Sequence, residues 1–403
     1  SSSKRRLRFP KRPQQTRRRW VEGLMKMTTH EADSTTVFRS DKRLAVVFTT
    51  LALIAVAMLS LASSAPAAKA PKGFFAIAPQ EGVTRNDTAK MKAGGIHSMR
   101  VAVSWTSIQP KSAKKFDWNA LDSTVKAAAR NKVRVLPVLY DSPPWLTNRP
   151  TNLPVATRNQ LDRWRNFVAE AVDRYGPDGA FWKQPNYKNG KLPKMSIREW
   201  QIWNEVNFYY FATPVSPAKY AKLLNASAAT IRHHDPGADV MVSGLYGTPK
   251  GPARKAMDAD DYIRKLSKYV KRSSVDSVAL HAYAPDTSGI KSIVTKVRRA
   301  MVQSGFRTRP MLITEMGWGS GSGNAFLKGS QSGQARQMKS AFNYLVSARH
   351  KLKLRRVYWY AWKDTDPRGE NCSFCYTVGL FKHGKGLKPK KAWNTFKSFS
   401  YRP

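Results

Sequence analysis

From Gly73 onward, short apolar runs alternate with longer segments whose apolar residues recur about every 3.6 positions. Short, nearly continuous apolar runs are typical of parallel strands buried on both faces, and the longer segments are typical of amphipathic helices. The pattern predicts eight strands, at residues 73–78, 98–104, 133–139, 199–203, 239–243, 277–281, 311–314 and 356–361. It predicts helices at residues 120–131, 159–175, 217–233, 260–271, 290–304, 334–348 and 391–399.

Eight strand–helix units in residues 71–403 suit one domain, a single (β/α)8 TIM barrel of the α/β class. The alternative is a doubly wound sheet, which should carry a glycine-rich turn after its first strand. The chain there reads Pro79-Gln80-Glu81-Gly82 and has no G-x-G-x-x-G motif. The barrel is therefore favoured, and it should place catalytic residues at the C-terminal ends of its strands.

The first seventy residues do not share this pattern. Residues 1–43 are polar and basic, residues 44–62 are apolar and uncharged, and small residues including Ala65-Pro66-Ala67 follow within 44–70. This order is typical of a signal peptide with its cleavage site. The alternative is an uncleaved membrane anchor, because the apolar stretch is long enough to span a bilayer. Both interpretations leave the basic leader cytoplasmic and predict that residues 71–403 are secreted or extracytoplasmic.

The chain is strongly basic, with 70 Lys and Arg against 26 Asp and Glu and a formal net charge of +44. The basic residues are scattered, and no zinc-finger, RNP-like or basic-zipper pattern accompanies them. We therefore expect no specific nucleic-acid partner. A solvated basic surface is the simplest interpretation, and attraction to an anionic or envelope-associated polysaccharide is the alternative. Membrane contact is expected only through an uncleaved 44–62 segment.

Acidic residues are scarce, so those at the ends of apolar strands stand out. They are Asp141, Glu205, Glu315 and Asp364. We interpret Asp141 and Asp364 as loop and turn residues that bond nearby backbone, because their neighbours are typical of turns. Glu205 and Glu315 lie in richer contexts, where a carboxylate loses hydration unless it is paired, hydrogen-bonded or protonated.

Two carboxyl groups that converge on one cleft with different pKa values are what glycoside hydrolysis requires. One group protonates the leaving oxygen, and the other attacks or stabilises the anomeric carbon. The alternative is that Glu205 and Glu315 are structural residues paired with Arg100 or a lysine. Arg100 lies in the middle of a predicted strand and needs compensation, most simply by a carboxylate.

Other polar residues near the strand ends could hold a substrate. His281 and Tyr283 are two positions apart and point to the same face of a strand. Asn204 and Glu205 are adjacent, so a regular strand would send them to opposite faces. If both face the substrate, the strand must kink or bulge there.

Tryptophans also cluster near the predicted strand ends. For any one of them core packing is the simpler interpretation, whereas several at one rim would form a platform for sugar rings. Those near strand ends are Trp105, Trp145, Trp203, Trp318, Trp359 and Trp362.

Several motifs together resemble the strand signatures of glycoside hydrolase clan A, whose members are retaining, mostly β-specific glycosidases on (β/α)8 barrels. They are Trp203-Asn204-Glu205, His281-x-Tyr283, Thr314-Glu315 and Trp362. Within the clan, the stretch 174–179 leading to 200–205, and the tail 379–393, resemble family 39 and the bacterial exopolysaccharide endoglycosidases near it. The resemblance covers about residues 73–400.

The resemblance implies that Glu205 is the acid/base, that Glu315 is the nucleophile and that Asn204 holds the sugar 2-hydroxyl. It implies a two-step reaction through a covalent glycosyl-enzyme with net retention of configuration. One departure is Val206, where the family usually has proline. Proline would stiffen this loop, so we expect a different loop shape and the same chemistry.

The resemblance also implies supporting residues. Arg100, His281 and Tyr283 would support the nucleophile, and Trp362 would form the floor of the −1 subsite. We place Trp318 in the same substrate-binding set, as an aromatic residue near a strand end. No metal and no organic cofactor are expected, and we expect a monomer.

Two other activities fit the same residues. A non-catalytic glycan- or envelope-binding barrel would make the glutamates structural, and transglycosylation would pass the covalent intermediate to a sugar acceptor. The motif Cys372-Ser373-Phe374-Cys375 has three interpretations: a redox pair, half of a zinc site, or a short disulfide. In an exported chain the Cys372–Cys375 disulfide is favoured.

Overall fold

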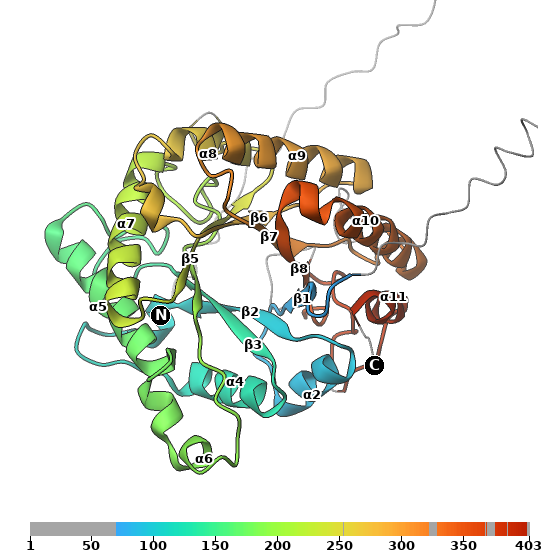
Figure 1. Cartoon of the computed structure of the whole chain (residues 1–403), viewed down its shortest axis with the longest axis horizontal. Coiled ribbons are helices and arrows are strands. Elements are labelled where there is room, and N and C mark those ends of the chain that lie inside the picture. Colours follow the sequence, from blue (N-terminus) through green and yellow to red (C-terminus); the bar gives the residue numbers. More distant parts are fainter. Residues whose placement is uncertain are drawn as a thin grey trace, which may run out of the picture. The chain divides into compact units, whose positions relative to one another are not determined.

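The computed structural model describes residues 70–252, 254–321, 329–366, 368, 375–384 and 386–400. The predictions for the leader and for the apolar segment 44–62 lie outside these residues. Within them, eight parallel strands form a closed barrel in the order β1 to β8, and helices surround it (Figure 1). The predicted (β/α)8 barrel is therefore confirmed.

All eight predicted strands are present, with ends shifted by a few residues. They are β1 (Phe75–Ala78), β2 (Ser98–Ser104), β3 (Arg134–Tyr140), β4 (Glu199–Ile202), β5 (Asp239–Tyr246), β6 (Ser277–His281), β7 (Met311–Met316) and β8 (Leu354–Tyr360). The predicted long helices correspond to α4 (Asn119–Arg130), α5 (Arg158–Tyr175), α7 (Pro217–His234), α8 (Ala259–Leu266), α9 (Thr287–Gln303), α10 (Gln331–Leu352) and α11 (Lys391–Ser400).

Some short elements were not predicted from periodicity. They are α2 (Arg85–Ala93), α3 (Trp105–Ile108), α6 (Pro185–Lys188), η1 (Ala180–Lys183) and η2 (Arg272–Ser274). Helix α2 buries little apolar surface, and its first turn is stabilised instead by a capping box between Thr84 and Asp87. A Thr-x-x-Asp pattern was thus the available signal for this helix.

Helix α5 illustrates how the outer layer supports the strands. Thr157 caps its N-terminus by accepting a hydrogen bond from the backbone N–H of Gln160. Its apolar face buries Trp164 and Phe167 against the barrel. The Trp164 ring lies 5.8 Å from the ring of Trp203, which follows β4. Aromatic packing of this kind fixes the end of β4 from outside the barrel.

The ladder between strands is irregular near the C-terminal ends. The register shifts between Val242 and Leu245 in the β5–β6 pair, and between Leu280 and His281 in the β6–β7 pair. Such shifts bend a strand and re-aim its side chains. None of the helices in the described part of the chain is long and apolar enough to cross a membrane.

Candidate active site

The chain kinks where β4 ends. Trp203 (φ 67°) and Glu205 (φ 40°) adopt left-handed backbone conformations, which cost about 1–3 kcal/mol each for residues other than glycine. The N–H of Glu205 donates to the carbonyl of Gly244 on β5 at 3.1 Å, and this bond helps to hold the strained segment. Because of the kink, Asn204 and Glu205 both reach partners at the open end of the barrel, as the sequence required.

Arg100 on β2 joins three groups at the centre of this end. Its guanidinium donates to Glu315 Oε1 at 2.6 Å, to Asn204 Oδ1 at 2.7 Å and to Gln201 Oε1 at 3.1 Å. The residue is 7% exposed, so its charge needs a buried partner. The expectation that a carboxylate compensates Arg100 is confirmed.

Glu315 is held at both oxygens. Arg100 bonds Oε1, and the Tyr283 hydroxyl donates to Oε2 at 2.8 Å. Burial raises the pKa of the Tyr283 phenol well above its ordinary value, and the nearby charge of Glu315 raises it further. Tyr283 therefore keeps its proton and acts as a donor. Two fixed donors orient the Glu315 carboxylate towards the open end of the barrel.

Glu205 lies in a different environment. Burial raises the pKa of its carboxyl well above the ordinary value of 4.5, the charge of Glu315 raises it further, and Arg100 acts in the opposite direction. An oxygen of Glu205 and an oxygen of Glu315 lie within 4.8 Å of each other. A carboxyl with a raised pKa, this close to a carboxylate that is paired with an arginine, suits a proton donor beside an ionised partner.

His281 on β6 lies between the two glutamates. Its Nδ1 is 2.7 Å from Glu205 Oε1, and its Nε2 is 3.4 Å from Glu315 Oε1 without forming a hydrogen bond. Burial, and then the charge of Arg100, lower the pKa of the imidazole well below its ordinary value, so the ring is neutral. The resemblance implied support of the nucleophile, whereas the hydrogen bond of His281 goes to Glu205.

The ring of His281 fits against β5 only because position 244 is glycine. A Cβ atom at Gly244 would lie 2.1 Å from His281 Nε2. The backbone of β5 therefore approaches the imidazole more closely than any other residue would permit. The sequence analysis did not identify Gly244, because only the fold brings it beside His281.

The loop after Glu205 is fixed by Asn207. Its side-chain amide donates to the carbonyls of Tyr246 and Met257, both at 2.7 Å, and its Oδ1 accepts from the N–H of Tyr246 at 2.9 Å. Val206, which occupies the usual proline position, is fully buried. Stiffness that proline would give is thus supplied by side-chain hydrogen bonds.

The structure buries the two tryptophans that were predicted to contact substrate. Trp318 is 3% exposed, and its indole N–H donates to the carbonyl of Ala284. Trp362 is 1% exposed, donates to Asp87 on α2 and packs against Phe381. Both indole N–H groups are therefore bonded to other parts of the protein, and contact of either ring with substrate stays a prediction.

The other tryptophans near strand ends do not form a rim platform either. Trp105 stacks on Phe167 at 5.3 Å, and Trp145 is half-buried with its indole N–H on the carbonyl of Gln109. Trp203 and Trp359 are fully buried. Core packing, which was the simpler interpretation for each ring, therefore describes these four tryptophans. The large aromatic rings fill the space in the outer layer of the barrel.

Tyrosines take the place beside the glutamates instead. A cavity of about 530 Å³ is lined by Phe208, Tyr246, Lys250 and Tyr283, among others. Burial and then the charge of Glu205 raise the pKa of Tyr246, which places this phenol in the electric field of the site. Tyr360, at the end of β8, packs edge-to-face against Tyr283 at 6.5 Å. Of these aromatics, only Tyr283 was predicted.

Asp141 and Asp364 behave largely as turn residues. Asp141 accepts hydrogen bonds from the Ser104 hydroxyl at 2.5 Å and from the N–H of Thr106 at 2.8 Å. Asp364 accepts from the N–H of Gly379 at 2.8 Å and also pairs with Lys390 at 2.8 Å. Neither carboxyl contacts the glutamate pair in the described structure.

The site contains three groups that could hold a metal ion. Glu205, His281 and Glu315 offer three potential metal ligands within 4.8 Å. However, the guanidinium of Arg100 is bonded to Glu315, and its positive charge opposes a second cation at that point. The predicted disulfide falls partly outside the described residues, because Cys372 is not described; Cys375 is buried.

Family comparisons agree with this geometry. Residues 193–383 match the family model of a glycosyl hydrolase catalytic core, and residues 78–167 match a β-galactosidase family model. The first segment contains Glu205, His281, Tyr283 and Glu315. No curated protein sequence matches the chain.

The solved structures that are similar to this chain include glycosidases of low sequence identity. A family 39 glycoside hydrolase from Bacteroides cellulosilyticus WH2 is 18% identical with a TM-score of 0.59, and the match covers 81% of this chain but only 63% of that enzyme. A monomeric β-xylosidase from Caulobacter crescentus CB15 is 17% identical with a TM-score of 0.57, covering 82% and 68%.

A third match covers a larger share of the solved enzyme. The GH5_18 enzyme of Streptomyces cattleya, in complex with Manβ1-4GlcNAc, is 15% identical with a TM-score of 0.61, and the match covers 82% of this chain and 80% of that enzyme. The family matches, the paired glutamates and the fold agree: residues 193–383 resemble a glycosyl hydrolase catalytic core, carried on a (β/α)8 barrel.

Proposed function

We propose that this protein is an exported, retaining glycosidase that hydrolyses β-linked oligosaccharides or polysaccharides, with Glu315 as nucleophile and Glu205 as acid/base. The observation that carries the proposal is the asymmetry between the two carboxyls. Glu315 is fixed as an ion pair with Arg100, whereas burial keeps the pKa of Glu205 high. Their oxygens lie within 4.8 Å, close to the separation of about 5–5.5 Å that retention requires.

In the first step, Glu315 attacks the anomeric carbon and the bond from that carbon to the leaving oxygen breaks. Glu205 gives its proton to the leaving oxygen, so the aglycone departs as a neutral alcohol. Arg100 and Tyr283 hold the two oxygens of Glu315, which aligns one of them for attack. Asn204, itself bonded to Arg100, is positioned to contact the sugar beside the reacting carbon.

The first step also prepares the second. Once Glu315 has formed an ester, its negative charge is gone, and the electrostatic effect that raised the pKa of Glu205 is removed. Glu205, now ionised, can then take a proton from water. The resulting hydroxide attacks the anomeric carbon, the ester bond breaks, and both carboxyls return to their starting states.

The cavity beside Tyr283 is the proposed position for part of the substrate. It is lined by Phe208 and Tyr246, whose rings can stack on sugars, and by Tyr283, which donates to Glu315. Cleavage by neighbours of this fold, such as the β-xylosidase, supports a β-linked substrate. The exported location rests on the basic, apolar and small-residue order of residues 1–70.

The test is hydrolysis of a panel of β-linked aryl glycosides and polysaccharides by the full chain, with product configuration followed by NMR. Retained configuration, complete loss of activity in Glu315→Gln and strong loss in Glu205→Gln are expected. A 2-fluoro glycoside should label Glu315 covalently. Labelling of any other carboxylate would overturn the assignment, and binding of glycans without cleavage by the folded protein would favour the non-catalytic barrel.

A further inference from the structure

A second cavity lies at the opposite, N-terminal end of the barrel. Its volume is about 500 Å³, and seven of its twelve lining residues are basic while none is acidic. The basic residues come from four separate places: the segment before β1, the end of α2 with the connection to β2, the α4–β3 connection with the start of β3, and the start of β8. Segments that are far apart in the sequence therefore each contribute positively charged side chains to this cavity.

Two of these cations are already neutralised by the barrel floor. Arg355 lies 2.6 Å from Asp239 and 3.2 Å from Glu199, and Arg356 lies 2.7 Å from Glu199. The partners come from the first residues of β4 and β5. These pairs close the end of the barrel and leave the two arginines no net excess charge.

The remaining cations have no such compensation. Lys72, Lys92, Lys132 and Arg134 are exposed and form no ion pair with any carboxylate in the described part of the chain. His97 sits among them, and its pKa is lowered first by burial and then by Lys92, Lys72 and Arg134. The cavity thus carries an excess of about four positive charges in a concave surface, which concentrates the electric field.

We propose that this N-terminal cavity binds the oxyanion groups of an anionic chain, such as the phosphates or carboxylates repeated along an acidic polymer. Arg134 offers a planar fork for one oxyanion, and the three lysines act as point charges around it. The cavity lies at the other end of the barrel from Glu205 and Glu315. It therefore holds an anionic chain without blocking the catalytic end, and its occupancy does not depend on the proposed reaction.

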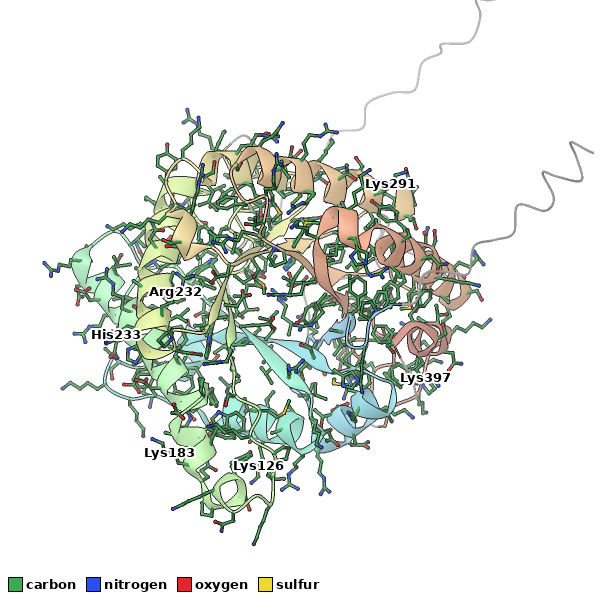
Figure 2. All side chains as sticks on the ribbon, in the orientation of Figure 1. Lys126, Lys183, Arg232, His233, Lys291 and Lys397 are labelled. Carbon is green, nitrogen blue, oxygen red and sulfur yellow. The ribbon has the colours of Figure 1, made fainter. Side chains whose placement is uncertain are left out.

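The proposal is tested by isothermal titration of the full chain with two probes, sodium tripolyphosphate and a carboxylate oligomer, oligogalacturonate. The test variant is Lys92→Gln/Arg134→Gln. The matched control, Lys183→Gln/Lys291→Gln, removes the same charge from exposed positions on η1 and α9; Figure 2 labels both, on different parts of the outer ring. Circular dichroism and thermal unfolding verify that each variant is folded.

At least one probe is expected to bind with one-to-one stoichiometry, and binding should weaken as salt increases. The test variant should lose about tenfold in affinity and show a shallower salt dependence, whereas the control should stay within about twofold. Binding of tripolyphosphate alone would identify phosphate as the oxyanion. Binding of oligogalacturonate alone would identify carboxylate. Absence of binding by both probes, or equal losses in test and control variants, would overturn the proposal.

Hydrolysis of a small neutral aryl glycoside separates this proposal from the proposed catalytic function. Both double variants should retain the wild-type kcat/KM on such a substrate, because neither touches the catalytic end. Loss of anion binding with intact hydrolysis would concern only the N-terminal cavity. Loss of hydrolysis with intact anion binding would concern only the proposed catalytic function.

Discussion

The two ends of the barrel both carry buried or half-buried charges on strand residues, and they balance them differently. At the N-terminal end, Glu199 and Asp239 face Arg355 and Arg356, two carboxylates against two guanidinium groups. At the C-terminal end, Glu205 and Glu315 share the single cation Arg100. Where carboxylates and guanidinium groups are equal in number, each charge has an opposite partner. Two carboxyls that share one cation cannot both ionise easily.

The direction of the pKa shifts follows this difference. At the N-terminal end, the pKa of the Arg356 guanidinium is raised, chiefly by the nearby Tyr358 and also by Glu199, so its charge is reinforced. At the C-terminal end, the pKa of Glu205 is raised and a proton is retained. One end therefore stabilises the barrel, and the other stores the proton that the proposed reaction uses.

The comparison is tested most strongly by the same substitution at each end. Glu315→Gln should lower kcat/KM by at least about 1,000-fold, because it removes the proposed nucleophile. Glu199→Gln should leave kcat/KM within about twofold but reduce the free energy of unfolding by about 2 kcal/mol, since it removes the carboxylate partner of Arg356 and one of the two partners of Arg355. Steady-state kinetics and thermal denaturation of both variants measure the two effects. An active Glu315→Gln enzyme would end the proposed division of roles.

The next effect concerns how closely the C-terminal end is packed. Gly244→Ala should lower kcat/KM by about 100-fold, because its Cβ would lie 2.1 Å from His281 Nε2 and would move the imidazole off Glu205. Gly82→Ala is the matched control, since a Cβ there meets nothing within 4 Å. Kinetics of the two variants give the result. Equal activity in both would mean that the His281–Glu205 hydrogen bond does not position the acid/base.

The pH dependence should report the proton held by Glu205. Its pKa is raised in the folded protein, so its contribution to stability is complete below the unfolded value and is lost as pH rises through the folded pKa. The kcat/KM profile should likewise fall about tenfold per pH unit above an apparent pKa higher than 4.5.

Glu205→Gln provides the control for this profile. With an aryl glycoside whose leaving group needs no proton, the variant should form the covalent intermediate at a rate that does not fall at alkaline pH. Pre-steady-state release of the aryl group measures this step. A basic limb that persists in Glu205→Gln would assign the titration to another group.

The architecture and the glutamate pair could be predicted because both leave strong local signals. Continuous apolar runs specify parallel strands buried on both faces. A carboxylate that ends such a run, as Glu205 and Glu315 do, is costly unless it has a use. The need to compensate Arg100 and the kink at Asn204 followed from the same reasoning, because each concerns one residue and its immediate strand.

What could not be predicted depends on contacts between distant segments. Trp318 and Trp362 follow strand ends, but the direction of a side chain beyond a strand has no periodicity to reveal it, and both rings are buried. Gly244 and Asn207 matter through His281 and Tyr246, which lie on other strands. Tyr246 resembles an ordinary strand-end aromatic until the fold places it in the cavity with Tyr283, where the charge of Glu205 helps to raise its pKa.

The smallest effect separates substrate binding from charge at the C-terminal end. Tyr246→Ala removes a ring that packs against Phe208 at 5.5 Å and lines the cavity next to Tyr283. It should raise KM for an oligosaccharide about five- to tenfold with little change in kcat, because stacking on a sugar is lost while both carboxyls keep their partners. Tyr269→Ala, which truncates a tyrosine that is 57% exposed and outside the cavity, should leave both constants unchanged.

If Tyr246→Ala instead lowered kcat and shifted the basic limb of the pH profile, this phenol would belong to the electrostatic unit around Glu205. The contrast between the two ends would then involve three titrating groups rather than two.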